Sequence, residues 1–119
     1  MTTFTTDFCS MELYTRYVIL TIYEEVELNL SKALVIRQKL SEEFKDNDFL
    51  MISNRKFKHI VTEEVYKKGQ LANMKGLAIV SDSEKEREKA LYEQKMFNKS
   101  FAFFRELDDA KSWAENYFY

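Results

Sequence analysis

A short basic stretch near the middle of the chain holds the residues best suited to bind a ligand. It follows directly on an apolar run typical of a buried strand, and it consists of Ser53, Asn54, Arg55 and Lys56. Open α/β sheets bind ligands at the carboxyl ends of their strands, and an arginine there can hold a phosphate or carboxylate with two parallel hydrogen bonds. The stretch therefore predicts a site for a protein partner, a small anion or a nucleotide. The alternative is an exposed loop whose arginine braces a helix end.

The sequence lacks the constellations that mark enzymes and metal sites. Its one histidine, His59, and its one cysteine, Cys9, fall in unrelated segments. A zinc site needs about four converging ligands, mostly His or Cys. There is no glycine-flanked serine of the hydrolase type, and glycine is too rare for a phosphate-binding loop. We therefore expect a protein that is not an enzyme and that carries no metal or other cofactor.

Composition sets the class of protein and its compartment. The net charge of −2 argues against nucleic acid as a partner, because phosphate binding usually needs a basic face. A single cysteine excludes an internal disulfide and favours a reducing compartment. The first ten residues show no signal-peptide pattern, and the longest apolar-rich run, residues 17–23, is too short to span a bilayer. These features predict a cytoplasmic protein that does not bind membranes.

The apolar pattern predicts one α/β domain over residues 1–119, in the order β-β-α-β-α-β-α-β-α. Alternation predicts a hairpin of two strands, and spacings of three and four predict the first helix, with Asn29 as its N-cap. A capping box of Ser83 and Glu86 opens a highly charged helix. The strands are predicted at residues 7–14, 16–24, 49–52, 77–80 and 100–104, and the helices at 30–44, from about 62, at 83–97 and at 107–118.

Such alternation predicts a mostly parallel sheet of about five strands joined by right-handed crossovers, with the helices mainly on one face. The expected core residues are Leu20, Ile22, Ile36, Leu40, Leu50, Ile52, Ile79, Val80, Phe103 and Trp113.

One face of the second predicted strand is a candidate interface. Side chains alternate along a strand, so Tyr17, Ile19 and Tyr23 share the face that points away from the helices. An uncovered aromatic face usually marks an interface, and it predicts a homodimer. The alternative is that the N-terminal segment or a C-terminal helix covers this face.

The element order and four stretches of sequence resemble the SpoIIAA-like fold of bacterial STAS domains. The resemblance is strongest to small stand-alone bacterial proteins of this class that are uncharacterised. The stretches are YVILTIYEEVELNLSKALVIRQKL, FLMISNRK, GLAIVSDSE and FAFFRELDDAKSWAE, which together cover nearly the whole chain from Met11 onward.

This resemblance implies a cytoplasmic, non-enzymatic domain with a regulatory or protein-interaction function. The best-known members of the class are anti-sigma-factor antagonists, which are switched by phosphorylation of a serine that opens the helix after the third strand. The corresponding stretch here runs from Ile52 to Lys56 and lacks the acidic and small residues that flank that serine in the family. The resemblance nevertheless implies a phosphoswitch at Ser53 as an alternative to the partner or anion site.

Overall fold

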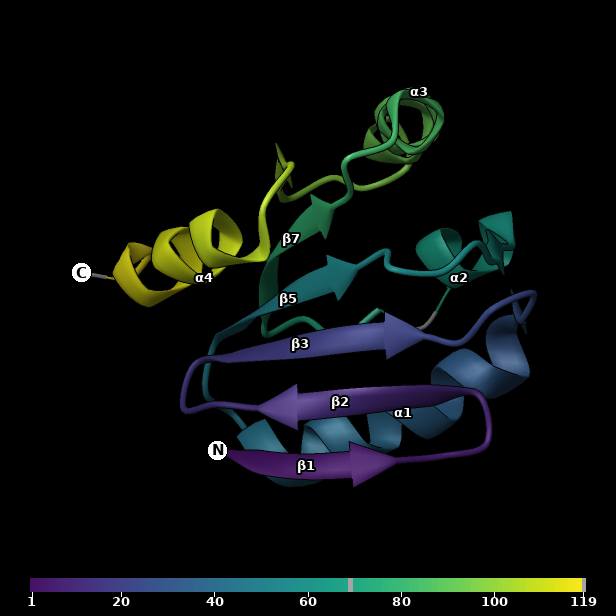
Figure 1. Ribbon diagram of the computed structural model, residues 1–119. Helices are drawn as coiled ribbons and strands as arrows, with labels where there is room; N and C mark the ends of the chain where they lie inside the picture. Colours follow the sequence, from purple (N-terminus) through teal and green to yellow (C-terminus); the bar gives the residue numbers. More distant parts are fainter. Residues whose placement is uncertain (69, 119) are drawn as a thin grey trace.

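A six-stranded sheet forms the centre of the molecule, in a computed structural model that describes residues 1–68 and 70–118 (Figure 1). The strand order is β1-β2-β3-β5-β7-β8; β1, β2 and β3 are antiparallel neighbours, and the strands from β3 to β8 run parallel. The strands are β1 (Thr2–Thr5), β2 (Cys9–Leu13), β3 (Tyr17–Ile22), β5 (Phe49–Asn54), β7 (Met74–Val80) and β8 (Ser100–Phe104). Two short strands, β4 (Glu27–Leu28) and β6 (Ile60–Val61), pair separately.

The expected fold class is confirmed, with one strand more than expected in the main sheet. The extra strand is β1, which pairs antiparallel with β2 at the edge of the sheet. Its sequence, TTFT, is mostly exposed. A strand with no buried face carries no apolar alternation, and for that reason the sequence pattern did not predict it.

Four helices complete the described chain, and α1 and α3 begin at side-chain caps. They are α1 (Leu30–Phe44), α2 (Glu63–Lys67), α3 (Glu84–Gln94) and α4 (Leu107–Asn116). The Asn29 side chain accepts a hydrogen bond from the backbone N–H of Lys32 at 3.0 Å, as a helix N-cap does. The Ser83 hydroxyl accepts from the backbone N–H of Glu86 at 3.4 Å. The N-caps Asn29 and Ser83 are confirmed, but the capping box is not complete, because the backbone N–H of Ser83 donates to the Ser81 hydroxyl instead of Glu86. Thr62, at the N-cap position of α2, makes no side-chain capping hydrogen bond.

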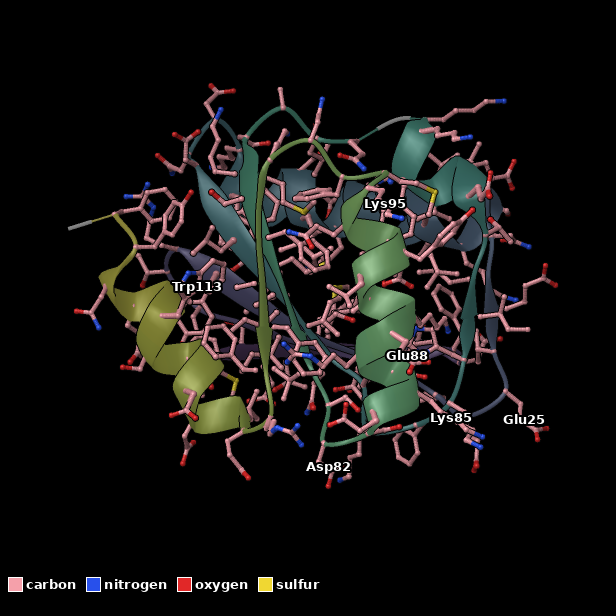
Figure 2. The ribbon with its side chains drawn as sticks, turned by 90° about the horizontal axis from the view of Figure 1, so that it is seen from above. Glu25, Asp82, Lys85, Glu88, Lys95 and Trp113 are labelled. Atoms are coloured by element: carbon pink, nitrogen blue, oxygen red, sulfur yellow. The ribbon has the colours of Figure 1, made fainter. Side chains whose placement is uncertain are left out.

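The helices divide between the two faces of the sheet. The helices α1, α2 and α3 connect neighbouring parallel strands, so a constant right-handed crossover places all three on one face. Seen from above, α4 with its labelled Trp113 lies on the opposite side of the sheet from α3 (Figure 2). No crossover constrains α4, because it leads to no further strand among the described residues.

The position of α4 corrects the expectation of an uncovered strand face. Tyr17 and Ile19 are only 4% and 2% exposed, and they pack in one cluster with Ala110 and Ala114 of α4. The Tyr17 hydroxyl also donates a hydrogen bond to Glu115 at 2.9 Å. The C-terminal helix thus covers this face, which was the alternative considered above. A homodimer built on Tyr17 and Ile19 is not compatible with their burial.

Tyr23, the third residue of that predicted face, lies just beyond the end of β3 and is half-buried.

The predicted core residues are buried in the structure, with two exceptions. Phe103 and Trp113 are half-buried, because Phe103 lies on the edge strand β8 and Trp113 packs beside Phe104 of the same strand.

Candidate functional site

The four residues predicted as a binding loop do not lie together on the surface. Ser53 and Asn54 are the last residues of β5, and the backbone N–H of Arg55 continues the pairing with a 2.9 Å hydrogen bond to Val80. Ser53 and Arg55 are each 7% exposed, whereas Lys56 is exposed. The stretch is therefore strand rather than loop up to Arg55, and only part of it faces solvent.

Arg55 is bound by acidic residues of α3. Its Nη1 and Nη2 donate to the two carboxylate oxygens of Glu93 at 3.0 and 2.6 Å, in the two-pronged geometry that an external anion would need. Nη1 also lies 3.4 Å from Glu86. Burial by itself would lower the pKa of Arg55, but the charges and hydrogen bonds of Glu93 and Tyr66 together outweigh burial, and the pKa is raised. Arg55 braces α3 against the sheet, which was the alternative role considered for it.

The rest of the Arg55 guanidinium is also engaged. Nε donates to the Ser53 hydroxyl at 3.4 Å, and Nη2 donates to the Tyr66 hydroxyl of α2 at 3.4 Å. A single arginine thus connects β5, α2 and α3. Ser53 is buried within this network, so its hydroxyl is not accessible to a kinase in this conformation.

His59 lies beside this network and is 6% exposed. Burial first, and then the positive charge of Arg55, lower its pKa to about 4. The imidazole is therefore neutral at neutral pH. The backbone carbonyl of His59 accepts a 2.7 Å hydrogen bond from the Lys89 ammonium group, which connects this segment to α3 as well.

A cavity of about 80 Å³ lies between the sheet and the helices α1 and α2. Its walls are mainly aliphatic and aromatic, with side chains from β3, α1, α2 and β7. The polar side chains that border it include Arg55 with its partners Ser53 and Tyr66, and the neighbouring His59. We call this space the apolar cavity.

Arg37 of α1 also borders the apolar cavity, and it fastens α2. It donates to the backbone carbonyls of Val65 and Lys68 at 2.5 and 2.7 Å, where α2 ends. Burial lowers the pKa of Arg37. A cation at a helix C-terminus satisfies carbonyls that have no partner within the helix. Arg37 therefore holds α2 in place over the apolar cavity.

Sequence reasoning missed Glu93, Glu86, Tyr66 and Arg37. A signal for the two glutamates was present in α3. Glu86 and Glu93 fall on the same helical stripe as Ala90, the buried face of this charged helix. A carboxylate on a buried stripe requires a cationic partner. The periodicity could therefore have indicated that an arginine of the sheet is paired inside the protein.

Across residues 1–68 and 70–118, no three His, Cys, Asp or Glu side chains converge to form a metal site. Within the same described part of the chain, no helix is both long and apolar enough to cross a bilayer.

Comparison with known structures identifies the fold. A crystal structure from Shewanella loihica PV-4, of an uncharacterised DUF3478-family protein with a SpoIIAA-like fold, matches with a TM-score of 0.59. The match covers 89% of this chain and 91% of that chain, at 14% sequence identity. This protein therefore has the SpoIIAA-like fold. No protein-family model matches the sequence, and no curated protein matches it either.

Proposed function

We propose that this protein is a non-catalytic binding domain that holds a small apolar molecule in the apolar cavity. The observation that carries the proposal is a space of about 80 Å³ with mainly apolar walls between α1, α2 and the sheet. This space is partly open to solvent, so an apolar ligand that entered it would cover apolar side chains that the protein itself leaves uncovered.

The size of the apolar cavity suits a small ligand or one end of a larger one. One buried water occupies roughly 10–15 Å³ of cavity volume. A cavity of 80 Å³ therefore has room for about five to eight groups of that size, which is a ligand of about five to eight non-hydrogen atoms. The mainly apolar walls match a ligand held by burial rather than by ionic contacts.

The hydrogen bonds made by the polar side chains at the cavity support a non-catalytic function. A general base must lie within hydrogen-bond reach of a nucleophile. The Ser53 hydroxyl accepts from Arg55, and His59 Nδ1 lies 3.3 Å from the backbone carbonyl of Phe57. Ser53 and His59 thus make their hydrogen bonds to other groups, and they are not arranged as a nucleophile and its base. The one cysteine, Cys9, is fully buried and so is not placed to form a disulfide with another chain, which supports the cytoplasm as the compartment.

The test is a benzene titration followed by methyl NMR, with a variant that fills the apolar cavity. Ala33 borders the cavity and is buried, so Ala33→Met places a larger side chain there. We expect benzene to shift the methyl signals of Leu20 and Val65 in the wild type and not in Ala33→Met. Ala72→Met is the matched control, because Ala72 is exposed and away from the cavity.

Methyl signals that do not respond to millimolar benzene would refute the proposal. So would shifts of equal size in Ala33→Met, because the benzene would then bind elsewhere. A heat-unfolding scan of both variants checks that each is folded before titration.

A second candidate function, self-association, is favoured by a groove between α3 and β8. The groove is about 240 Å³ and is bordered by Leu91, Phe101 and Phe103. Leu91 is 52% exposed, and β8 is an edge strand of the sheet. Edge strands with apolar side chains favour pairing with another chain, and a second copy paired about a two-fold axis is the simplest occupant.

Sedimentation equilibrium tests this second candidate. Leu91→Lys places a charge beside its symmetry mate, so we expect it to lower the fraction of dimer. Glu88→Lys is the control, because Glu88 is an exposed residue of the same helix that does not border the groove. A wild type that stays monomeric at high concentration rules out self-association at this groove.

A further inference from the structure

We infer that the apolar cavity selects an uncharged ligand over an anion of the same shape. This inference rests on the proposed function, and it names the ligand class that the cavity takes. It also bears on the alternative of an anion site at Arg55, since Arg55 is one of the two arginines that border the cavity.

The first argument is that Arg55 has no donor left for a ligand. Each of its guanidinium nitrogens already donates to a protein oxygen: Nε to Ser53, Nη1 to Glu86 and Glu93, and Nη2 to Glu93 and Tyr66. The charge of Arg55 is also balanced, because two carboxylates lie within 3.4 Å of it. An anionic ligand would have to displace Glu93 from a two-pronged contact.

The second argument is that Arg37 is committed to α2. Its two terminal nitrogens donate to the carbonyls of Val65 and Lys68, at the end of that helix. A ligand carboxylate that drew Arg37 away would leave these carbonyls without their partner. It would also release the helix that covers the cavity.

The third argument concerns the other polar groups on the cavity wall. Ser53, Tyr66 and Gln70 are uncharged, and the buried imidazole of His59 is neutral at pH 7. An ion transferred to such a site loses its hydration, and it gains a counter-charge only by pairing with Arg37, which two carbonyls already hold. A neutral amide or hydroxyl loses far less hydration. Glu86 and Glu93 together outweigh the charge of Arg55, so this network offers an anion no net positive charge.

Hexanamide and hexanoate form the experimental pair. They have the same chain and the same number of non-hydrogen atoms, and at pH 7 only hexanoate is charged. Methyl NMR titration of the wild-type protein measures both affinities. We expect hexanamide to bind at least about tenfold more tightly than hexanoate. Ala33→Met should abolish the shifts from hexanamide, which locates the binding.

The cause is tested by removing the charge that balances Arg55. Glu93→Gln should raise the affinity for hexanoate severalfold relative to that for hexanamide, because the guanidinium becomes free to pair with the ligand. If Glu93→Gln does not fold, Glu86→Gln is the milder variant: it keeps the Arg55–Glu93 pair and removes only the charge of Glu86 beside Nη1, so it should raise the relative affinity for hexanoate by a smaller factor. Glu88→Gln is the control on the exposed face of α3.

Each outcome decides between the inference and the function on which it rests. Equal or tighter binding of hexanoate in the wild type overturns the inference and leaves the proposed function intact. If neither hexanamide nor hexanoate shifts the methyl signals, the inference is overturned as well. The benzene titration then shows whether the proposed function falls with it.

Discussion

Arg55 illustrates how strongly a buried charge depends on one partner. Its side chain is 2% exposed, and the closest carboxylate oxygen, of Glu93, lies at 2.6 Å. Glu93→Gln leaves the guanidinium buried and poorly compensated, so we expect a loss of about 3–5 kcal/mol in the free energy of unfolding. Urea denaturation measures it. Glu88→Gln, at an exposed position on the same helix, should change the free energy by less than about 0.5 kcal/mol.

The double variant Arg55→Met, Glu93→Leu separates charge from packing. Replacing a buried ion pair by apolar residues of similar volume is often neutral. We therefore expect most of the stability lost in Glu93→Gln to return in the double variant. A double variant that is as unstable as the single one would show that the contacts of Arg55 with Ser53 and Tyr66 matter more than its charge.

His59 gives the protein a defined pH dependence. Its pKa is about 4 in the folded protein against 6.5 for a free side chain, so the unfolded state binds the extra proton between these values. The stability that depends on neutral His59 is complete above pH 6.5 and is lost as the pH falls towards 4. The amount is about 3 kcal/mol.

Urea unfolding at a series of pH values between 4 and 7 measures this dependence. His59→Asn should flatten the curve in this window relative to the wild type, because asparagine has no proton to gain. Curves that stay parallel for the two proteins would show that other groups cause the acid sensitivity.

At the residue scale the sequence predicted positions better than roles. It placed Arg55 correctly at the carboxyl end of a buried strand, but it could not show that the guanidinium is already paired. Glu93 is 38 residues away in sequence, and only the packing of α3 on the sheet brings the two together. Similarly, the apolar cavity is a property of how α1 and α2 pack, and no local pattern of residues encodes unfilled space.

Among the elements, Gly76 in β7 lies close against both neighbouring strands, β5 and β8. A Cβ at this position would lie 2.8 Å from Cδ2 of Leu50 and 3.3 Å from Cβ of Ser100. Leu50 is fully buried and cannot move aside freely. We expect Gly76→Ala to lower the free energy of unfolding by about 1–3 kcal/mol through overpacking.

A double-mutant cycle with Leu50→Ala checks the cause of that loss. Shortening Leu50 makes room for the new methyl group, so the two changes together should cost less than the sum of the separate changes. Additive losses would mean that Ser100, rather than Leu50, resists the Cβ. Thermal or urea unfolding of the four proteins gives the coupling energy.

The predictability of each element depended on burial. The helices α1 and α3 and the strands β3 and β8 were predicted because each carries either a strong apolar period or a clear cap. The strand β1 was not predicted, since it is mostly exposed. The side of the sheet taken by α4 was left open, because no crossover rule applies to a helix that leads to no further strand.

For the whole molecule, α4 decides whether the sheet is covered on both faces. Ala110 is fully buried against the sheet, so Ala110→Asp should detach α4 and cost at least about 3 kcal/mol through burial of an unpaired charge. The freed face of Tyr17 and Ile19 should then promote self-association. Ser112→Asp is the control, because Ser112 is exposed on the same helix.

Light scattering and circular dichroism measure this effect together. We expect a higher apparent mass for Ala110→Asp than for Ser112→Asp, with the secondary structure of the sheet retained. An Ala110→Asp protein with the same mass and stability as its control would show that α4 is not needed as a cover.

The same arrangement has a consequence for how the chain reaches its native state. The hydrogen bond between Tyr17 and Glu115 joins residues that are 98 positions apart, so the α4 face closes one of the longest loops in the described chain. Long-range contacts form late, because the entropy of closing a large loop must be overcome first. On the opposite face the helices can pack one after another, because each helix directly follows the strand beside which it packs. We therefore expect an intermediate in which β3 is formed while its aromatic face is still bare, and in that interval the chain is most prone to aggregate.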